Sequence, residues 1–178
     1  MVDKGRRKQP VVLDASPLIH LAKLDALGVF EVGSYDPLVP TRVIEEVATP
    51  ALIYRHPDAM AVEEAARRRA LSVIPLAPAE EWTAERLSEQ LPGMHMGECQ
   101  VLAVAVERAI PAVIFERRGR SVAQALGVEL IDVIELLFDG TPDPVRLETR
   151  IRQLAALVNM RLADFEALRA RIEQRRLR

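Results

Sequence analysis

Short apolar runs alternate with amphipathic stretches along the chain. In the amphipathic stretches apolar residues recur every three or four positions, as on one face of a helix, whereas the short runs are rich in β-branched residues. The apolar runs predict strands at residues 11–13, 37–40, 71–76, 112–115 and 128–130. The amphipathic stretches predict helices at residues 16–24, 41–48, 56–70, 77–91, 97–109 and 119–127.

Strands that alternate with helices predict an α/β fold, a three-layer sandwich in which a central parallel sheet lies between helices. Residues 10–140 would form this body, after a flexible lead-in at residues 1–9. The turn-forming segment DGTPDP then separates a helical tail, residues 141–178, whose apolar residues keep a helical spacing.

Charge is spread unevenly between these parts. Residues 1–145 carry 15 Lys and Arg against 22 Asp and Glu, whereas residues 146–178 carry 9 Arg against 4 acids. An arginine-rich tail on an acidic body predicts that the tail meets something negative, which is RNA, an acidic partner or the body itself. No apolar run is long enough to span a membrane, and a single cysteine fits a reducing, cytoplasmic compartment.

Acidic residues recur where strands lead into helices. Asp14 and Glu116 end apolar runs, Glu98 follows Gly97 in the first turn of a helix, and Glu45 and Glu46 lie in another early turn. Each placement alone is ordinary, because the helix dipole favours acids there. Since ligands gather beyond the carboxyl ends of parallel strands, one pocket could collect all of them. Such a pocket would suit Mg²⁺ or Mn²⁺ and metal-assisted phosphodiester hydrolysis.

Four segments together resemble the PIN domain, and more closely its prokaryotic, toxin-type (VapC-like) branch. They are VVLDASPLIHLAKL, VPTRVIEEV, MGECQVLAVAVERA and VIFERRGRSVAQALG, and the resemblance covers roughly residues 10–140. It implies a compact α/β fold and a Mg²⁺- or Mn²⁺-dependent ribonuclease. Many such proteins are toxins of toxin–antitoxin pairs, often homodimers held by a small antitoxin protein.

The resemblance also implies roles for single residues. Asp14, Glu46 and Glu98 match three catalytic, metal-binding acids, with Glu45 as the fallback for Glu46. Ser16 matches a small polar position that could hold Asp14 or a metal-bound water, although capping the helix explains it equally well.

The fourth segment departs from the family pattern, in which the strand usually ends in two Asp. Here Phe115 stands at the first of these positions and Glu116 at the second, with Arg120 at a downstream arginine. A phenyl ring cannot ligate a metal, so Glu116 would complete the acidic set alone. Arg117, Arg118 and Arg120 would meet the RNA backbone or neutralise the acids.

The sequence therefore predicts an endoribonuclease, the toxin of a toxin–antitoxin pair. The rival hypothesis is a PIN-like domain that has lost its chemistry and acts as a binding module through its helical tail; a DNA nuclease is a third. RNA contacts are expected from arginines on phosphate rather than from base stacking, because aromatics are scarce and Trp82 is expected in the core. Cys99 is expected to pack rather than react, and His95 could contact phosphate.

Overall fold

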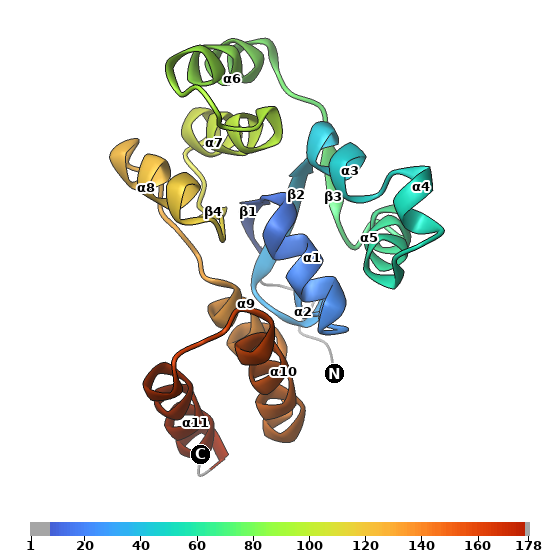
Figure 1. Ribbon diagram of the computed structural model, residues 1–178, viewed down its shortest axis with the longest axis vertical. Coiled ribbons are helices and arrows are strands. Elements are labelled where there is room, and N and C mark those ends of the chain that lie inside the picture. The colour runs from blue at the N-terminus through green and yellow to red at the C-terminus, as the bar shows by residue number, and fades with distance from the viewer. Residues whose placement is uncertain (1–7, 177–178) are drawn as a thin grey trace.

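The computed structural model describes residues 8–176. Its single sheet is entirely parallel and runs in the order β3-β2-β1-β4 (Figure 1). Val12 of β1 pairs with Leu38 of β2 on one side and with Ala112 of β4 on the other, so β1 is a central strand. The strands are β1 (Gln9–Leu13), β2 (Tyr35–Pro40), β3 (Ser72–Ile74) and β4 (Ala112–Val113).

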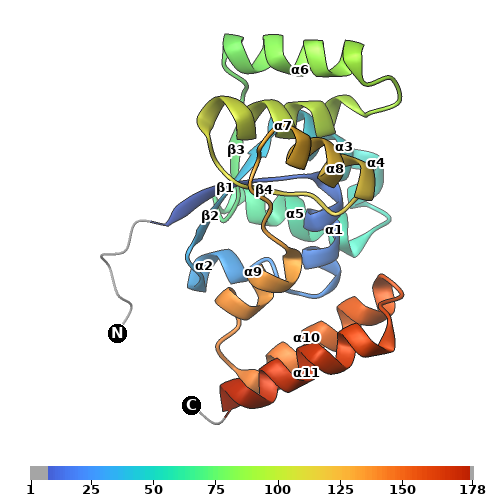
Figure 2. The ribbon, with the colours of Figure 1, turned by 90° about the vertical axis from the view of Figure 1, so that its left-hand side faces the viewer.

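Helices cover both faces of this sheet, which confirms the predicted α/β sandwich. Helix α7 packs on β1, β2 and β4 and carries α6 on its outer side, while α1 and α5 lie together across the opposite face (Figure 2). The helices of the body are α1 (Ala15–Lys23), α2 (Val29–Val32), α3 (Thr41–Val47), α4 (Pro50–Ile53), α5 (Pro57–Arg67), α6 (Pro78–Gln90), α7 (Met96–Arg108), α8 (Arg117–Ala125) and α9 (Val133–Gly140).

The apolar pattern explains the layering. Val11, Val12 and Leu13 are fully buried, as expected for a strand covered on both faces. The middle of α7, residues 101–105, is also buried on every side because the helix lies between the sheet and α6. Within residues 8–176 no helix is long and apolar enough to cross a membrane.

Some local predictions need correction. The strand expected at 128–130 contributes only one bridge, between Leu130 and Ala112. Trp82 is 58% exposed rather than in the core, with the guanidinium of Arg86 lying over its ring. The helix predicted from residue 119 already begins at Arg117, but it does close at Gly127, whose φ of +73° suits a residue without a side chain.

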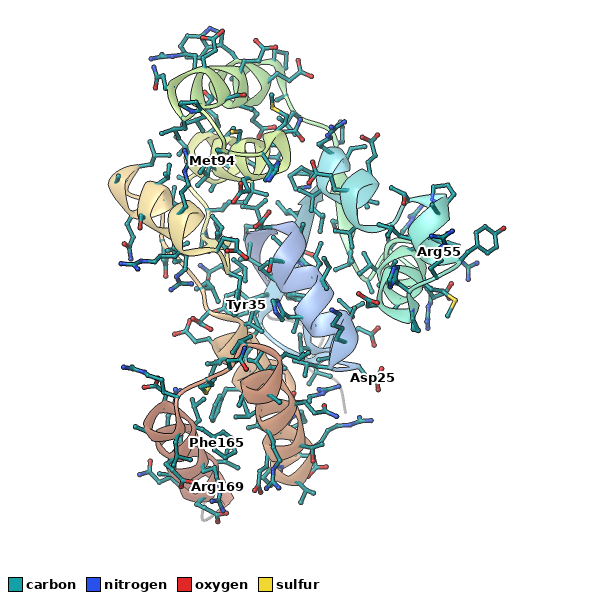
Figure 3. All side chains as sticks on the ribbon, in the orientation of Figure 1. Asp25, Tyr35, Arg55, Met94, Phe165 and Arg169 are labelled. Atoms are coloured by element: carbon teal, nitrogen blue, oxygen red, sulfur yellow. The ribbon has the colours of Figure 1, made fainter. Side chains whose placement is uncertain are left out.

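The tail forms two helices, α10 (Pro144–Leu157) and α11 (Leu162–Arg176), which pack against each other and, through α10, on α9. Arg150 of α10 is only 8% exposed, and it donates hydrogen bonds to Thr141 Oγ1 at 2.9 Å and to the Asp25 carbonyl. Asp25, labelled in Figure 3, follows α1, so this guanidinium joins the tail to the first helical layer of the body.

Much of the positive charge of the tail is balanced locally. Arg152 and Arg169 both approach Glu148, at 3.1 and 3.9 Å, and Arg161 pairs with Asp164 at 2.8 Å. Arg171 lies 4.4 Å above the ring centroid of Phe138, on α9. Part of the positive charge of the tail is thus met by acids of the tail itself, which were not among the predicted partners, and the body contributes the ring of Phe138.

Candidate active site at the carboxyl edge of the sheet

Asp14 lies where β1 ends and α1 begins, and it is only 4% exposed. Its backbone N–H donates to the Val113 carbonyl at 3.1 Å, which fixes it beside the end of β4. Burial raises the pKa of its carboxyl from 3.8 to about 6. A hydrogen bond from the Ala15 backbone opposes this rise, and the negative charges of Glu98, Glu46 and Glu116 add to it.

The structure thus brings together the four acids that the sequence singled out. They come from the ends of β1 and β4, from the last turn of α3 and from the first turn of α7, elements that meet at the edge where the parallel strands end. Whether they act in catalysis stays a prediction. The negative charges of Glu98, Glu46 and Glu116 add to the pKa rise that burial causes at Asp14, and such clusters of like charges are typical of functional sites.

Glu46 rather than Glu45 faces this site. A Cβ placed on Gly97 would lie 2.7 Å from Glu46 Oε2, so this carboxylate rests directly on the start of α7. The Glu45 side chain is 61% exposed, against 36% for Glu46, and its charge is not among those that act on Asp14.

Arg42 holds Glu46 from the side. Its Nε lies 3.4 Å from Glu46 Oε1, whereas its Nη1 is 3.9 Å from Glu45 Oε2. Sequence reasoning missed this arginine, although its spacing of four residues from Glu46 places both on one face of α3. Arg42 partly neutralises the site and orients one of its acids.

Glu98 has two roles. Its Oε2 accepts a hydrogen bond from the His95 N–H at 3.0 Å, which satisfies a free amide at the start of α7. Its Oε1 lies 3.5 Å from the point where a Cβ on Gly119 would stand. Gly97 and Gly119 therefore lack side chains for a spatial reason, since a Cβ would collide with Glu46 at the first and with Ile114 at the second. His95 itself is exposed.

The fourth corner carries an aromatic pair in place of an acid. The half-buried ring of Phe115 packs on that of His20, with 4.5 Å between ring centroids and 32° between ring planes. His20 Nδ1 lies 2.7 Å from the Ser16 carbonyl, and since a carbonyl only accepts, Nδ1–H donates. Sequence reasoning gave His20 no role, although the spacing of four residues from Ser16 could have indicated it. Glu116, next to Phe115, is exposed.

The three arginines after Glu116 separate into two kinds. Arg118 donates to the Pro92 carbonyl at 2.7 Å, and Arg120 donates to the Ile114 carbonyl at 3.0 Å and approaches Asp132 at 3.7 Å. Both hold α8 in place. The Arg117 carbonyl accepts from the Ser121 hydroxyl at 3.0 Å, but its side chain is exposed and, within residues 8–176, makes no hydrogen bond or ion pair, so it is the one of the three left to meet a ligand.

Two other predicted residues make fewer contacts. Ser16 is half-buried, and its hydroxyl has no hydrogen bond within the described part of the chain, so the structure gives it no capping role. Cys99 is fully buried, and burial raises the pKa of its thiol, which agrees with a packing role and disfavours a nucleophile.

The acids suit a hard divalent cation by donor type and by charge. Carboxylate oxygens are the ligands that Mg²⁺ and Mn²⁺ prefer, and a cation would favour the ionised form of Asp14, whose pKa is raised by burial and further by the charges of Glu98, Glu46 and Glu116. As they stand, no three acidic, His or Cys side chains of residues 8–176 converge closely enough to hold an ion. The Glu46 carboxylate points toward Arg42 and the Glu98 carboxylate toward the His95 amide. Binding of a metal ion therefore requires that both side chains rotate.

The chain is similar in fold to a PilT N-terminus domain protein from the hyperthermophilic archaeon Sulfolobus solfataricus P2, with 16% identity, 75% of this chain and 94% of that chain covered, and a TM-score of 0.49. No curated protein matches the sequence. A family model described as a PIN domain (DUF3368) matches residues 10–164, and PIN domains are generally nucleases that depend on divalent metals. Because this match spans most of the chain, the protein belongs to the PIN domain family.

Proposed function

We propose that this PIN domain is a Mg²⁺- or Mn²⁺-dependent endoribonuclease. The observation that carries the proposal is the buried carboxyl of Asp14 with three acids around it: burial raises its pKa to about 6, and the negative charges of Glu98, Glu46 and Glu116 add to the rise. A cluster of this kind favours a divalent cation strongly, since the cation relieves the repulsion among the acids.

Asp14, Glu46 and Glu98 would hold the ion, and the exposed Glu116 would complete the set. The bound cation supplies a water of lowered pKa and neutralises charge on the phosphodiester. The chain's own residues do the positioning: Arg42 keeps Glu46 against Gly97, and the His95 amide keeps Glu98 near Gly119.

Arg117 is the proposed contact to the RNA backbone. It adjoins Glu116 at the start of α8, and it is exposed and unpaired within the described residues. A guanidinium suits two oxygens of one phosphate, and such a contact makes binding dependent on salt concentration. Arg118 and Arg120 would act indirectly, by holding α8.

The test is a Mn²⁺ titration followed by calorimetry on the wild type and on Asp14→Asn and Glu98→Gln. Each variant should lose about tenfold or more in Mn²⁺ affinity, because a first ligand is neutralised. Glu45→Gln is the matched control, since its exposed carboxylate lies beside the site without acting on Asp14. Unchanged affinity in both Asp14→Asn and Glu98→Gln would refute the metal site.

Substrate choice is tested with labelled RNA and DNA strands of one sequence in Mn²⁺. We expect the wild type to cleave the RNA and Asp14→Asn not to cleave it. The wild-type rate should fall steeply as the salt concentration rises, and the rate of Arg117→Ala should fall less steeply, because one phosphate contact is missing. Cleavage of the DNA alone would contradict the assignment to RNA.

We also propose that the chain is the toxin of a toxin–antitoxin pair, held by a small antitoxin protein and paired with a second copy of itself. Expression of the wild type in a bacterial host should then arrest growth, while Asp14→Asn should not. Equal growth with both chains, at equal amounts of folded protein, would contradict this role.

Phe115 favours a second candidate, a PIN domain of reduced activity that binds RNA or a protein partner, acting through its helical tail. Its phenyl ring occupies a corner where the matching family pattern has an acid, and it packs on His20 instead of offering an oxygen. Phe115→Asp separates the two candidates. A large gain of RNA cleavage over wild type would identify the natural chain as impaired, whereas no gain would support the active enzyme.

A further inference from the structure

The rings of His20 and Phe115 form a pair beside the acidic set, and Phe115 also packs against the hydrophobic core. Both side chains are only half-buried, and they come from α1 and from the end of β4, which also carry Asp14 and Glu116. Aromatic residues make up only 4% of the chain, and this one pair lies at the edge of the acidic centre.

The pair is also held in a fixed arrangement. The hydrogen bond from His20 Nδ1 to the Ser16 carbonyl, at 2.7 Å, sets the rotation of the imidazole and its tautomer. Phe115 then packs on this ring in a tilted arrangement, with 4.5 Å between the ring centroids. A rigid, partly exposed π surface loses little entropy when a flat ligand stacks on it.

We infer that the His20–Phe115 pair is a stacking surface for an unpaired base of a single-stranded nucleic acid whose phosphodiester lies at the Asp14 cluster. A base has an apolar face that stacks on aromatic rings whatever its identity, and it is accessible only when it is not in a duplex. Arg117, two residues after Phe115, offers the cation for the adjoining phosphate.

The new element is the residue pair itself: it assigns the rings of Phe115 and His20 a role in holding the substrate. This inference rests on the proposed function for the position of the phosphate, but it concerns binding and not cleavage. The two can fail separately.

The experiment measures binding of the full chain to a labelled single-stranded RNA by fluorescence anisotropy in EDTA, so that cleavage does not intervene. Phe115→Leu keeps the apolar volume and removes the ring, and it should weaken binding about tenfold. Phe115→Tyr keeps the ring and should bind like the wild type. Trp82→Leu removes a more exposed ring, from α6, and should change nothing.

Two further probes show whether the base is what the ring contacts. On a strand with abasic positions, Phe115→Leu should cost no additional affinity, and on the same sequence annealed to its complement the wild type and Phe115→Leu should bind alike. His20→Leu should reproduce the loss on the intact single strand.

The inference is overturned if Phe115→Leu, with a wild-type melting curve, binds the intact single strand as the wild type does. It is also overturned if Phe115→Leu loses as much affinity for the abasic strand and for the duplex as it loses for the intact single strand. Failure of Mn²⁺ binding or of RNA cleavage, with the base-dependent loss intact, would instead refute the proposed metal-dependent enzyme.

Discussion

A carboxyl group as enclosed as that of Asp14 is costly to ionise, and three further acids around it increase the cost. Its pKa of about 6 lies above the 3.8 of the unfolded chain, so the folded protein binds this proton more tightly. Between about pH 4 and pH 6 unfolding releases the proton, and the free energy of unfolding falls as the pH rises. Above pH 6 the penalty is fully present.

Asp14→Asn should therefore stabilise the metal-free protein at pH 7.5, by about 1–3 kcal/mol, because it removes the buried charge. The difference from the wild type should vanish near pH 4. Urea unfolding in EDTA at both pH values measures it, with the exposed Asp36→Asn as control. A less stable Asp14→Asn protein at pH 7.5 would show that the ionised carboxylate stabilises the fold.

Residue types and spacing placed Asp14, Glu98 and Glu116 at one edge of the sheet, because each stands at a strand–helix junction and parallel strands end together. The choice of Glu46, in contrast, came from the family resemblance. The same reasoning could not predict the direction of each side chain. Arg42 pulls Glu46 aside, the His95 amide engages Glu98, and His20 covers Phe115. These contacts depend on packing between elements far apart in the sequence, which no local pattern contains.

Among the elements, α6 and α7 are joined by a nearly buried ion pair. The Glu80 side chain is 4% exposed and accepts from Arg108 Nη2 at 3.1 Å and from the Ala77 N–H at 2.7 Å. One carboxylate thus caps the start of α6 and fixes the end of α7. The hydrogen bonds from Arg108 hold the pKa of Glu80 below its ordinary 4.5, against the effect of burial.

Glu80→Gln should lower the free energy of unfolding by about 2–3 kcal/mol at pH 7, since it leaves Arg108 without a counter-charge. Because the folded pKa is depressed, the stabilisation is complete above pH 4.5 and is lost as the pH falls below it, so the difference should shrink near pH 3. Denaturant titration of both proteins measures this. Glu64 is half-buried and pairs with the exposed Arg67 and Arg68, so the control Glu64→Gln should lose much less stability than Glu80→Gln. A loss of equal size there would argue against a special role for Glu80.

Element prediction succeeded where apolar periodicity was long, as in α5, α6 and α7, and failed where it was short or uniform. Helices α2 and α4 span a single turn each and give no period to detect. Helix α9 is apolar almost throughout, so its pattern suits a strand as well as a helix. Its start does carry a signal, since Asp132 accepts a hydrogen bond from the Ile134 amide at 3.1 Å.

At the scale of the whole molecule, the tail is part of the packed structure. Leu147, Ile151 and Leu154 of α10 are buried, and so are Leu168 and Ile172 of α11. The buried Arg150 connects this hairpin to the turn after α1, where Asp25 adopts a positive φ of 48° and presents its carbonyl. Burial lowers the pKa of Arg150, but not enough to remove its charge.

Arg150→Met should lower the free energy of unfolding by about 2 kcal/mol, because the Thr141 hydroxyl and the Asp25 carbonyl lose their donor in a buried setting. Thermal melting of the full chain measures the change. Arg152→Met, two residues away and exposed, should melt close to the wild type. Equal melting of Arg150→Met and wild type would mean that the hairpin is held by its apolar contacts alone.

The strand order also determines the stage of folding at which the acidic residues come together. The central strand β1 pairs with β2 and with β4, and β4 lies beyond α7 in the chain. During synthesis the segment from β1 to β3 can associate first, but Glu98 and Glu116 join Asp14 only after β4 has emerged and docked. A stalled or truncated chain that ends before residue 116 therefore lacks the assembled cluster, which makes completion of the body a precondition for its chemistry.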